Sequence, residues 1–279
     1  MSILNMVTNV NPPMGIRAVI SAQEKVGKTT ILSSMPRPLL VPLEQGYAGI
    51  TMNKTPMLEH YAHVMSLMDE LIAARMAGQL PYMTIAFDSA TALERLIHQA
   101  VLESDPTFGK GNKKALTMEA ALGGYGKAYQ YANELFANFL AKCDQLALKG
   151  GVNIVLTCHV FAAEVVDPTA GTYNIWDLLL HSPKNQKTYG KREMLTQWAD
   201  MVGFLHEPIF VTEGEKGKMS RAASAGQGRV LGLTRTTGYV AGNRFGVTKE
   251  ISIPPVQGWN EVAQAIYESK GLDFYNRDV

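Results

Sequence analysis

The chain has 279 residues, of which 46% are hydrophobic and 18% charged, a composition that supports a sizeable core and excludes bulk disorder. Its formal net charge of +1 excludes the attraction of an anionic partner by an overall positive field, so local clusters of lysine and arginine must hold any such partner. Two cysteines in apolar surroundings, no basic secretory leader and no apolar run of about 18 residues predict a cytoplasmic protein that does not span a membrane.

The first part of the chain predicts a parallel sheet, because short β-type runs alternate with longer helical patterns. Strands are expected at residues 16–21, 39–43, 83–87 and 152–157. Before the fourth strand, apolar residues recur every three or four positions from 128 to 147. This spacing predicts a helix with one face on a core.

The last part of the chain is richer in β-type runs. Strands are expected at residues 201–205, 209–212, 230–234 and 250–253, and an amphipathic helix from about 259 to 269. No long linker divides the chain, so we expect an N-terminal extension (residues 1–14) and one domain (residues 15–279). The expected fold is α/β: a mostly parallel twisted sheet flanked by helices, with an antiparallel β extension toward the C-terminus.

Three long stretches lack a regular pattern and carry clustered cations. They cover residues 104–124, 167–191 and 213–229. Loops of this length inside a compact domain are usually functional or disordered. The third stretch is rich in glycine, serine and lysine, and we interpret it as a hairpin tip.

The stretch SAQEKVGKTT follows the first predicted strand and ends as a phosphate-binding loop does. Gly27, Lys28 and Thr29 close the pattern G-x-x-x-x-G-K-[ST], although Ala22 stands at the position of its first glycine. In such a loop, backbone N–H groups surround a polyphosphate, the lysine pairs with its β- and γ-phosphates, and the threonine hydroxyl ligates Mg²⁺. The alternative is a chance G-K-T at a strand–helix turn, but the helical run TTILSS that follows favours the phosphate loop.

Three more polar residues follow predicted strands. Asp88 ends the run YMTIAFD and suits a carboxylate that holds the water shell of Mg²⁺, or else a helix cap. Glu44 follows the second strand, where it can orient attacking water or serve as a solvated turn residue. His159 ends the run NIVLTCH, where it can sense a γ-phosphate or be structural.

These motifs resemble those of the RecA-type ATPase core. In that family a loop such as GPESSGKTT precedes an acidic DAE segment, a VVDS strand end and a strand that closes on a polar γ-phosphate sensor. The counterparts here are AQEKVGKTT, PLEQG, AFDS and TCH. The strings GYGK, LTCHV and GNRFG are similar to DYGK, LTAHE and KNRFG in phage-encoded minimal RecA-core ATPases, which assist single-strand annealing and often carry an AAA-type label.

The resemblance implies a RecA-like P-loop NTPase that binds and hydrolyses Mg–ATP. Its nucleotide-binding residues would be Gln23, Glu24, Lys25, Val26, Gly27, Lys28, Thr29 and Thr30. Its metal ligands would be Thr29 and Asp88, and its catalytic residues Lys28, Glu44, His159 and Arg244. Arg244, in the string YVAGNRFGVTKEISI, would reach the ATP of a neighbouring subunit, which implies a homo-oligomer (ring or filament) with ATP at the interface.

The resemblance also implies single-stranded DNA at two long loops, residues 104–124 and 164–191. Lysines that track phosphates and aromatic rings that stack on bases hold a single strand without reading its sequence. The implied DNA-binding residues are Lys110, Lys113, Lys114, Lys184, Lys187 and Lys191. The alternative is a set of ordinary solvated lysines beside partly buried rings.

The sequence therefore predicts an ATP-dependent, single-stranded-DNA-binding protein of phage-type recombination or annealing, located in the bacterial host cytoplasm if phage-encoded. A single-strand-binding protein is a further partner that this function admits. Two other functions stay open. One is an ATPase switch that binds a replication or repair protein without touching DNA, and the other is a nucleotide-binding module that hardly hydrolyses ATP.

Overall fold

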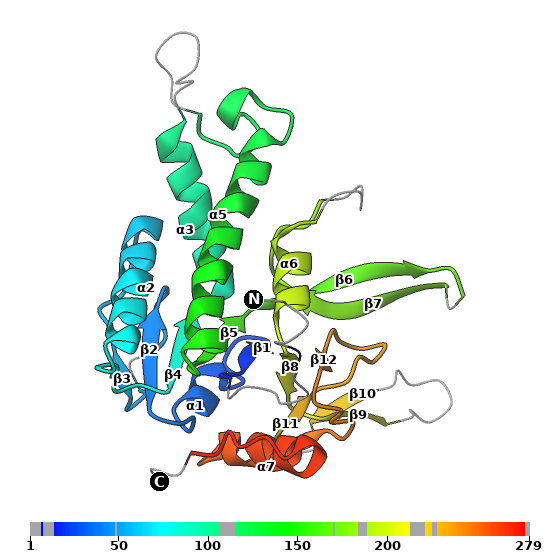
Figure 1. The fold of residues 1–279 in the computed structure, drawn as a ribbon. Coiled ribbons are helices and arrows are strands. Elements are labelled where there is room, and N and C mark those ends of the chain that lie inside the picture. The colour runs from blue at the N-terminus through cyan, green and yellow to red at the C-terminus, as the bar shows by residue number, and fades with distance from the viewer. Residues whose placement is uncertain are drawn as a thin grey trace.

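The computed structural model describes residues 7, 14–47, 49–105, 115–169, 171–183, 189–212, 221–224 and 228–276; for residues 209–212 and 221–224 it describes the backbone alone. The predicted N-terminal extension falls almost entirely outside these residues. Within the described part, nine strands form one sheet (Figure 1). Its parallel strands lie side by side in the order β8 (Met201–His206), β1 (Arg17–Ser21), β5 (Asn153–Cys158), β4 (Thr84–Asp88), β2 (Pro38–Pro42) and β3 (Asn53–Lys54).

The strands beyond β8 are antiparallel to their neighbours. They are β11 (Arg229–Gly232), which pairs with β8, β13 (Ile251–Ile253), which pairs with β11, and the short β12 (Gly242–Asn243), which also pairs with β8. The fold is thus an α/β P-loop NTPase core with a mostly parallel sheet and antiparallel strands on the C-terminal side, as predicted.

Successive residues of the central strands face two separate cores. In β1, Val19 belongs to one core, whereas Ala18 and Ile20 belong to the other. The first core lies under α2 (Tyr61–Met76), α3 (Ala90–Ser104) and α5 (Lys127–Asp144), and the second under α1 (Lys28–Leu32) and α7 (Gly258–Lys270) (Figure 1). Because both faces are covered, the central strands are buried along most of their length and have apolar middle residues, as in other parallel sheets.

The predicted strands and the C-terminal helix are confirmed, with ends that differ by at most two residues. The helix predicted at 128–147 is α5, which continues into a π-helical turn, η3 (Gln145–Lys149). None of the helices in the described part of the chain has the length and hydrophobicity that crossing a membrane requires.

The prediction of an irregular loop over residues 167–191 is wrong for its first part. β6 (Val160–Asp167) and β7 (Gly171–Leu178) form an antiparallel hairpin that projects from the body of the molecule (Figure 1). The valines of β6 and the aromatic residues of both strands favour extended structure. Between them, Asp167 accepts hydrogen bonds from the backbone N–H and the hydroxyl of Thr169, both at 2.7 Å, which forms a turn.

The other two stretches predicted to be irregular also contain short regular elements. β9 (Ile209–Thr212) and β10 (Arg221–Ser224) form a separate antiparallel pair, so residues 221–224 are strand rather than loop. The stretch 104–124 contains a 3₁₀ turn, η2 (Ala121–Gly123), which precedes α5. Beyond the β6–β7 hairpin, α6 (Lys191–Trp198) begins at the last residue of the stretch 167–191.

Candidate active site

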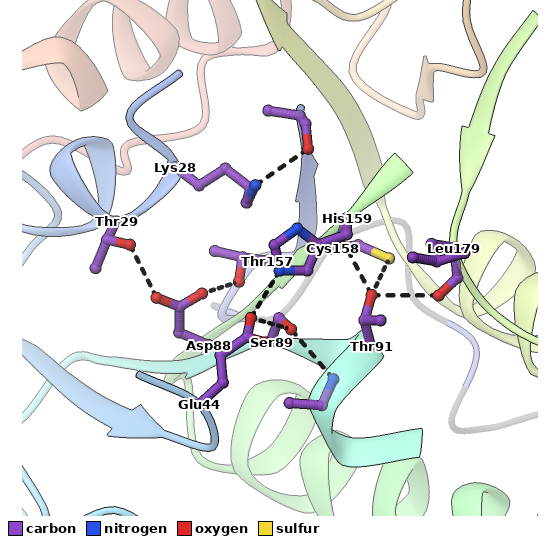
Figure 2. Close-up of polar contacts among 12 residues, drawn as sticks. Lys28, Thr29, Glu44, Asp88, Ser89, Thr91, Thr157, Cys158, His159 and Leu179 are labelled. Atoms are coloured by element: carbon purple, nitrogen blue, oxygen red, sulfur yellow. Dashed lines mark hydrogen bonds and ion pairs between the residues drawn. The ribbon is translucent and has the colours of Figure 1, made fainter. Parts of the chain in front are cut away.

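Four neighbouring strands end at the same edge of the sheet, and each is followed by a polar segment. β1 leads into the loop before α1, Asp88 ends β4, Glu44 follows β2, and His159 follows β5. Because parallel strands share their carboxyl edge, these residues meet around one cavity of about 580 Å³ (Figure 2). That volume lies within the range of about 300–1,000 Å³ usual for ligand pockets.

The loop before α1 has the backbone of a phosphate-binding loop. Gly27 has a φ of 100°, in the left-handed region that favours glycine, and a Cβ there would lie 2.0 Å from Nη1 of Arg229. Ala22 is fully buried and donates its N–H to the carbonyl of Cys158 at 3.2 Å. Its φ is not in the left-handed region, so alanine is tolerated where the motif usually has its first glycine.

Lys28 begins α1 and is only 8% exposed. Its Nζ donates to the backbone carbonyls of Ala22 and Gln23, both at 3.1 Å. Burial lowers the pKa of Lys28, and the nearby carboxylate of Asp88 opposes that shift. The ammonium is thus enclosed by the loop itself, with a third N–H donor left for an anionic group in the cavity.

Asp88 is held between two hydroxyl groups. Thr29 donates to Oδ2 of Asp88 at 2.8 Å, and Thr157 of β5 donates to Oδ1 (Figure 2). A hydroxyl and a carboxylate oxygen at the foot of a phosphate loop are the kind of ligands that Mg²⁺ takes, together with water and phosphate oxygens. Within the described residues, no group of three or more His, Cys, Asp or Glu side chains could hold a metal ion.

Glu44 receives three hydrogen bonds. Its carboxylate accepts from Nε2 of His159 at 2.8 Å, from the hydroxyl of Ser89 at 2.7 Å and from Nη2 of Arg95 at 2.8 Å (Figure 2 shows the first two). Burial alone would raise the pKa of Glu44, but the hydrogen bonds from His159 and Ser89, together with electrostatic attraction to His159 and Arg95, outweigh burial and lower the pKa to about 2. A carboxylate of this kind is ionised and is a weak base, so it suits the orientation of water better than the removal of a proton.

Thr91 connects the end of β5 to the end of β7. Its hydroxyl accepts from the backbone N–H of His159 and donates to the carbonyl of Leu179, both at 3.2 Å, and lies 3.5 Å from Sγ of Cys158 (Figure 2). α3 therefore carries Ser89, next to Glu44, and also holds the backbone at both ends of the β6–β7 hairpin.

The whole site lies inside a segment with a recognisable family pattern. Residues 14–245 match the AAA domain family, a match that covers most of the chain. The chain belongs to this family. Among curated proteins, none matches it. Membership supports ATP binding and hydrolysis in general, which agrees with the loop, the buried lysine and the carboxylates around the cavity.

Several residues of the AAA domain's site were missed by sequence reasoning. They are Ser89, Thr91, Arg95, Thr157 and Arg229. A signal existed for Thr91 and Arg95, which lie four residues apart and so share one face of α3. Ser89 directly follows Asp88, and its hydroxyl also accepts from the N–H of Ala92, which caps the helix. No sequence pattern pointed to Thr157 as a partner of Asp88.

Arg229 lies against the phosphate loop rather than in a free hairpin tip. Its Nη1 donates to the carbonyl of Val26 at 3.3 Å and its Nη2 to the carbonyl of Pro254 at 3.1 Å. None of the described residues forms an ion pair with it. The AAA domain thus has a second cation beside Gly27, in addition to Lys28.

Arg244 lies at the opposite edge of the sheet from the cavity. Its Nη1 contacts Oδ1 of Asp200 at 2.9 Å, and the N–H of Asp200 donates to the carbonyl of Arg17, the first residue of β1. The phosphate loop follows the other end of β1, so Arg244 cannot serve the site of its own subunit. Its side chain is 55% exposed, and its Nη2 donates to the carbonyl of Gln197 at 2.6 Å.

The prediction of DNA-binding lysines is wrong for one residue, Lys191. Lys191 is fully buried at the start of α6, where its Nζ lies 3.3 Å from Oε1 of Glu94 and 3.2 Å from Nε2 of His98. An ammonium enclosed in this way does not face a DNA phosphate. The other predicted members, Lys110, Lys113, Lys114, Lys184 and Lys187, lie outside the described residues.

The low pKa of Glu44 gives a testable pH dependence. Between about pH 2 and the ordinary carboxyl value of 4.5, Glu44 is ionised in the folded state and protonated in the unfolded state. Its contribution to stability is therefore present above pH 4.5 and is lost as the pH falls toward 2. Urea unfolding at several pH values from 3 to 4.5 should give a pH slope of the unfolding free energy that is smaller in Glu44→Gln, by at most about 1.4 kcal/mol per pH unit. Equal slopes in both proteins would contradict this assignment.

Proposed function

We propose that the protein is a Mg²⁺-dependent ATP hydrolase that binds single-stranded DNA and acts in phage-type recombination or single-strand annealing. The observation that carries this proposal is the link through Thr91. Its hydroxyl joins the strand end with His159 to the carbonyl of Leu179, which lies within residues 164–191, one of the two loops that the RecA-type resemblance assigns to DNA. The site can thereby respond to what that loop binds.

The residues of the cavity fit Mg–ATP. Loop amides and Lys28 would hold the phosphates, while Thr29 and Asp88 would hold Mg²⁺, which neutralises charge on the phosphate oxygens. Glu44, fixed by Ser89 and Arg95, would orient the attacking water. His159, whose Nε2 contacts the same carboxylate at 2.8 Å, would respond to the γ-phosphate.

Two exposed tyrosines support the proposal that the protein binds single-stranded DNA. Tyr125, just before α5, is 97% exposed, and Tyr189, just before α6, is 64% exposed. Asn133, in the first half of α5, donates its side-chain N–H to the carbonyl of Tyr189 at 3.0 Å, so the backbone of Tyr189 lies beside the half of the helix that Tyr125 precedes. Such rings offer free faces on which bases can stack, between segments that carry the predicted lysines.

A second candidate function, the switch that binds a protein partner, is favoured by the β6–β7 hairpin. Its two strands contain no lysine or arginine, but do contain Glu164 and Asp167. Val166 near the tip is 74% exposed. An apolar, slightly acidic arm repels phosphates and suits contact with a protein.

ATP turnover measured with and without single-stranded DNA tests the proposal. We expect stimulation by DNA, and binding that weakens with salt at a log–log slope of about −0.7 per phosphate neutralised. The double variant Lys184→Ala/Lys187→Ala should flatten that slope by about one unit or more if both side chains contact phosphate. The matched control Lys249→Ala/Lys270→Ala removes two exposed lysines near the C-terminus and should leave the slope unchanged. No binding at low salt, with or without ATP, would favour the protein partner.

A further inference from the structure

A second cavity of about 640 Å³ lies on the other side of the phosphate loop. Gln23 lines both this cavity and the candidate active site, and Val26 of the same loop lines the second one. The remaining walls come from the β6–β7 hairpin, the end of β8 and the segment around Tyr239. Whatever enters this cavity therefore touches the loop that holds the polyphosphate.

Four aromatic side chains line the second cavity. Phe204 and Tyr239 stack with ring centroids 4.7 Å apart, and His206 lies 5.2 Å from Phe204 and 5.3 Å from Tyr239. Trp176 has no ring partner among the described residues, and its backbone is fixed by hydrogen bonds with Gly238 and Val240 at 2.8 and 2.9 Å. The backbone of Trp176 is therefore held in place, and its side chain packs against the cluster of Phe204, Tyr239 and Ala241 without stacking on another described ring.

The polar groups of this cavity restrict the chemistry of a ligand. No lysine or arginine lines it, and Glu207 does. A phosphate would thus be repelled, whereas the amides of Gln23 and Asn174 can each donate and accept hydrogen bonds. The volume suits a small ring system rather than a helix or strand of another protein. The matching ligand is flat, aromatic, uncharged and able to form hydrogen bonds.

We propose that this cavity binds a nucleobase, with the ring stacked on Trp176. The base can come from single-stranded DNA, in which case the inference rests on the proposed function, or from the adenine of ATP. In both cases the phosphates stay outside the cavity, where the loop amides and lysines can meet them. Because Gln23 lines both cavities, a seated base also adjoins the polyphosphate site.

Trp176→Ala tests the proposal with pairs of ligands in which only one member carries a base. For DNA, the two probes are an oligothymidylate and an abasic oligomer of the same length. For ATP, they are Mg–ATP and Mg–tripolyphosphate. We expect Trp176→Ala to lower the affinity for one base-bearing probe by about ten-fold, as for the loss of one stacking platform. The affinity for its base-free counterpart should not change, and the pair that responds identifies the source of the base.

Tryptophan fluorescence supplies a second readout. A base stacked on Trp176 should quench its emission, so the responding probe should quench the parental protein and not Trp176→Phe. The matched control is Trp198→Phe, which removes an indole that contacts Arg17 and Asp144 far from the cavity and should preserve the quenching.

The outcomes separate this inference from the proposed function. If the parental protein binds the oligothymidylate and Trp176→Ala binds it and ATP equally well, the nucleobase cavity is wrong while DNA binding stands. If the variant loses affinity for base-free and base-bearing probes alike, Trp176 has a structural role and the inference is also wrong. If the protein binds no DNA but the ATP pair responds, the cavity holds adenine and only the DNA proposal fails.

Discussion

Lys28→Ala should lower ATP turnover by at least about 10²-fold, the loss usual when one electrostatic group of an active site is removed. The side chain is buried at the start of α1, and its ammonium is held by two carbonyls of the phosphate loop. Alanine removes the charge that would pair with β- and γ-phosphates as negative charge develops on them. Steady-state phosphate release with saturating Mg–ATP measures the effect.

A control variant away from the cavity separates charge at the phosphates from charge elsewhere on the chain. Lys270 is exposed at the end of α7 and does not line the cavity. Lys270→Ala should therefore keep most of the turnover. A Lys28→Ala variant that folds, as shown by its thermal unfolding, and still hydrolyses ATP at the parental rate would refute the phosphate-loop assignment.

Arg244→Ala should also remove most turnover, on the order of 10³-fold, although the residue is far from the cavity of its own subunit. An arginine supplied by a neighbouring subunit would stabilise the charge on the transferring phosphoryl group. Turnover per subunit should then rise with protein concentration. Folding should persist, because Arg17 still pairs with Asp200 through a contact of 2.7 Å.

Mixing two inactive variants tests whether Arg244 acts between subunits. Lys28→Ala subunits still carry the arginine, and Arg244→Ala subunits still carry an intact phosphate loop. A mixture should regain part of the activity, because some interfaces combine both. Lys249→Ala, which removes an exposed cation close in sequence, should stay active alone. If the mixture stays inactive although the variants co-assemble, or if a monomer is fully active, Arg244 does not act in this way.

The parts of the site that could be predicted from the sequence share one property: each follows a buried strand. Lys28, Glu44, Asp88 and His159 come after apolar runs, and the carboxyl ends of parallel strands meet at one edge. The α/β fold was predictable for the same reason, since strand and helix patterns alternate along the chain.

The parts that could not be predicted depend on contacts between distant segments. Arg229 lies about two hundred residues from the loop that it touches, and only the pairing of β11 with β8 brings it there. Lys191 is a lysine at the end of a predicted cationic loop, which suggested DNA binding, but Glu94 on α3 supplies a buried counter-charge. The valines of β6 and the turn at Asp167 were a sequence signal for the β6–β7 hairpin. The lysines that follow it favoured a long cationic loop instead.

Cys158, at the end of β5, has a consequence for chemical labelling. Burial raises the pKa of its thiol to about 12, so the folded protein keeps it protonated and unreactive at neutral pH. Alkylation therefore requires that the strand end between Asp88 and His159 opens to solvent. The rate at which a maleimide reacts with Cys158 then measures how often this edge of the sheet opens, and any ligand that tightens the edge protects the thiol in proportion.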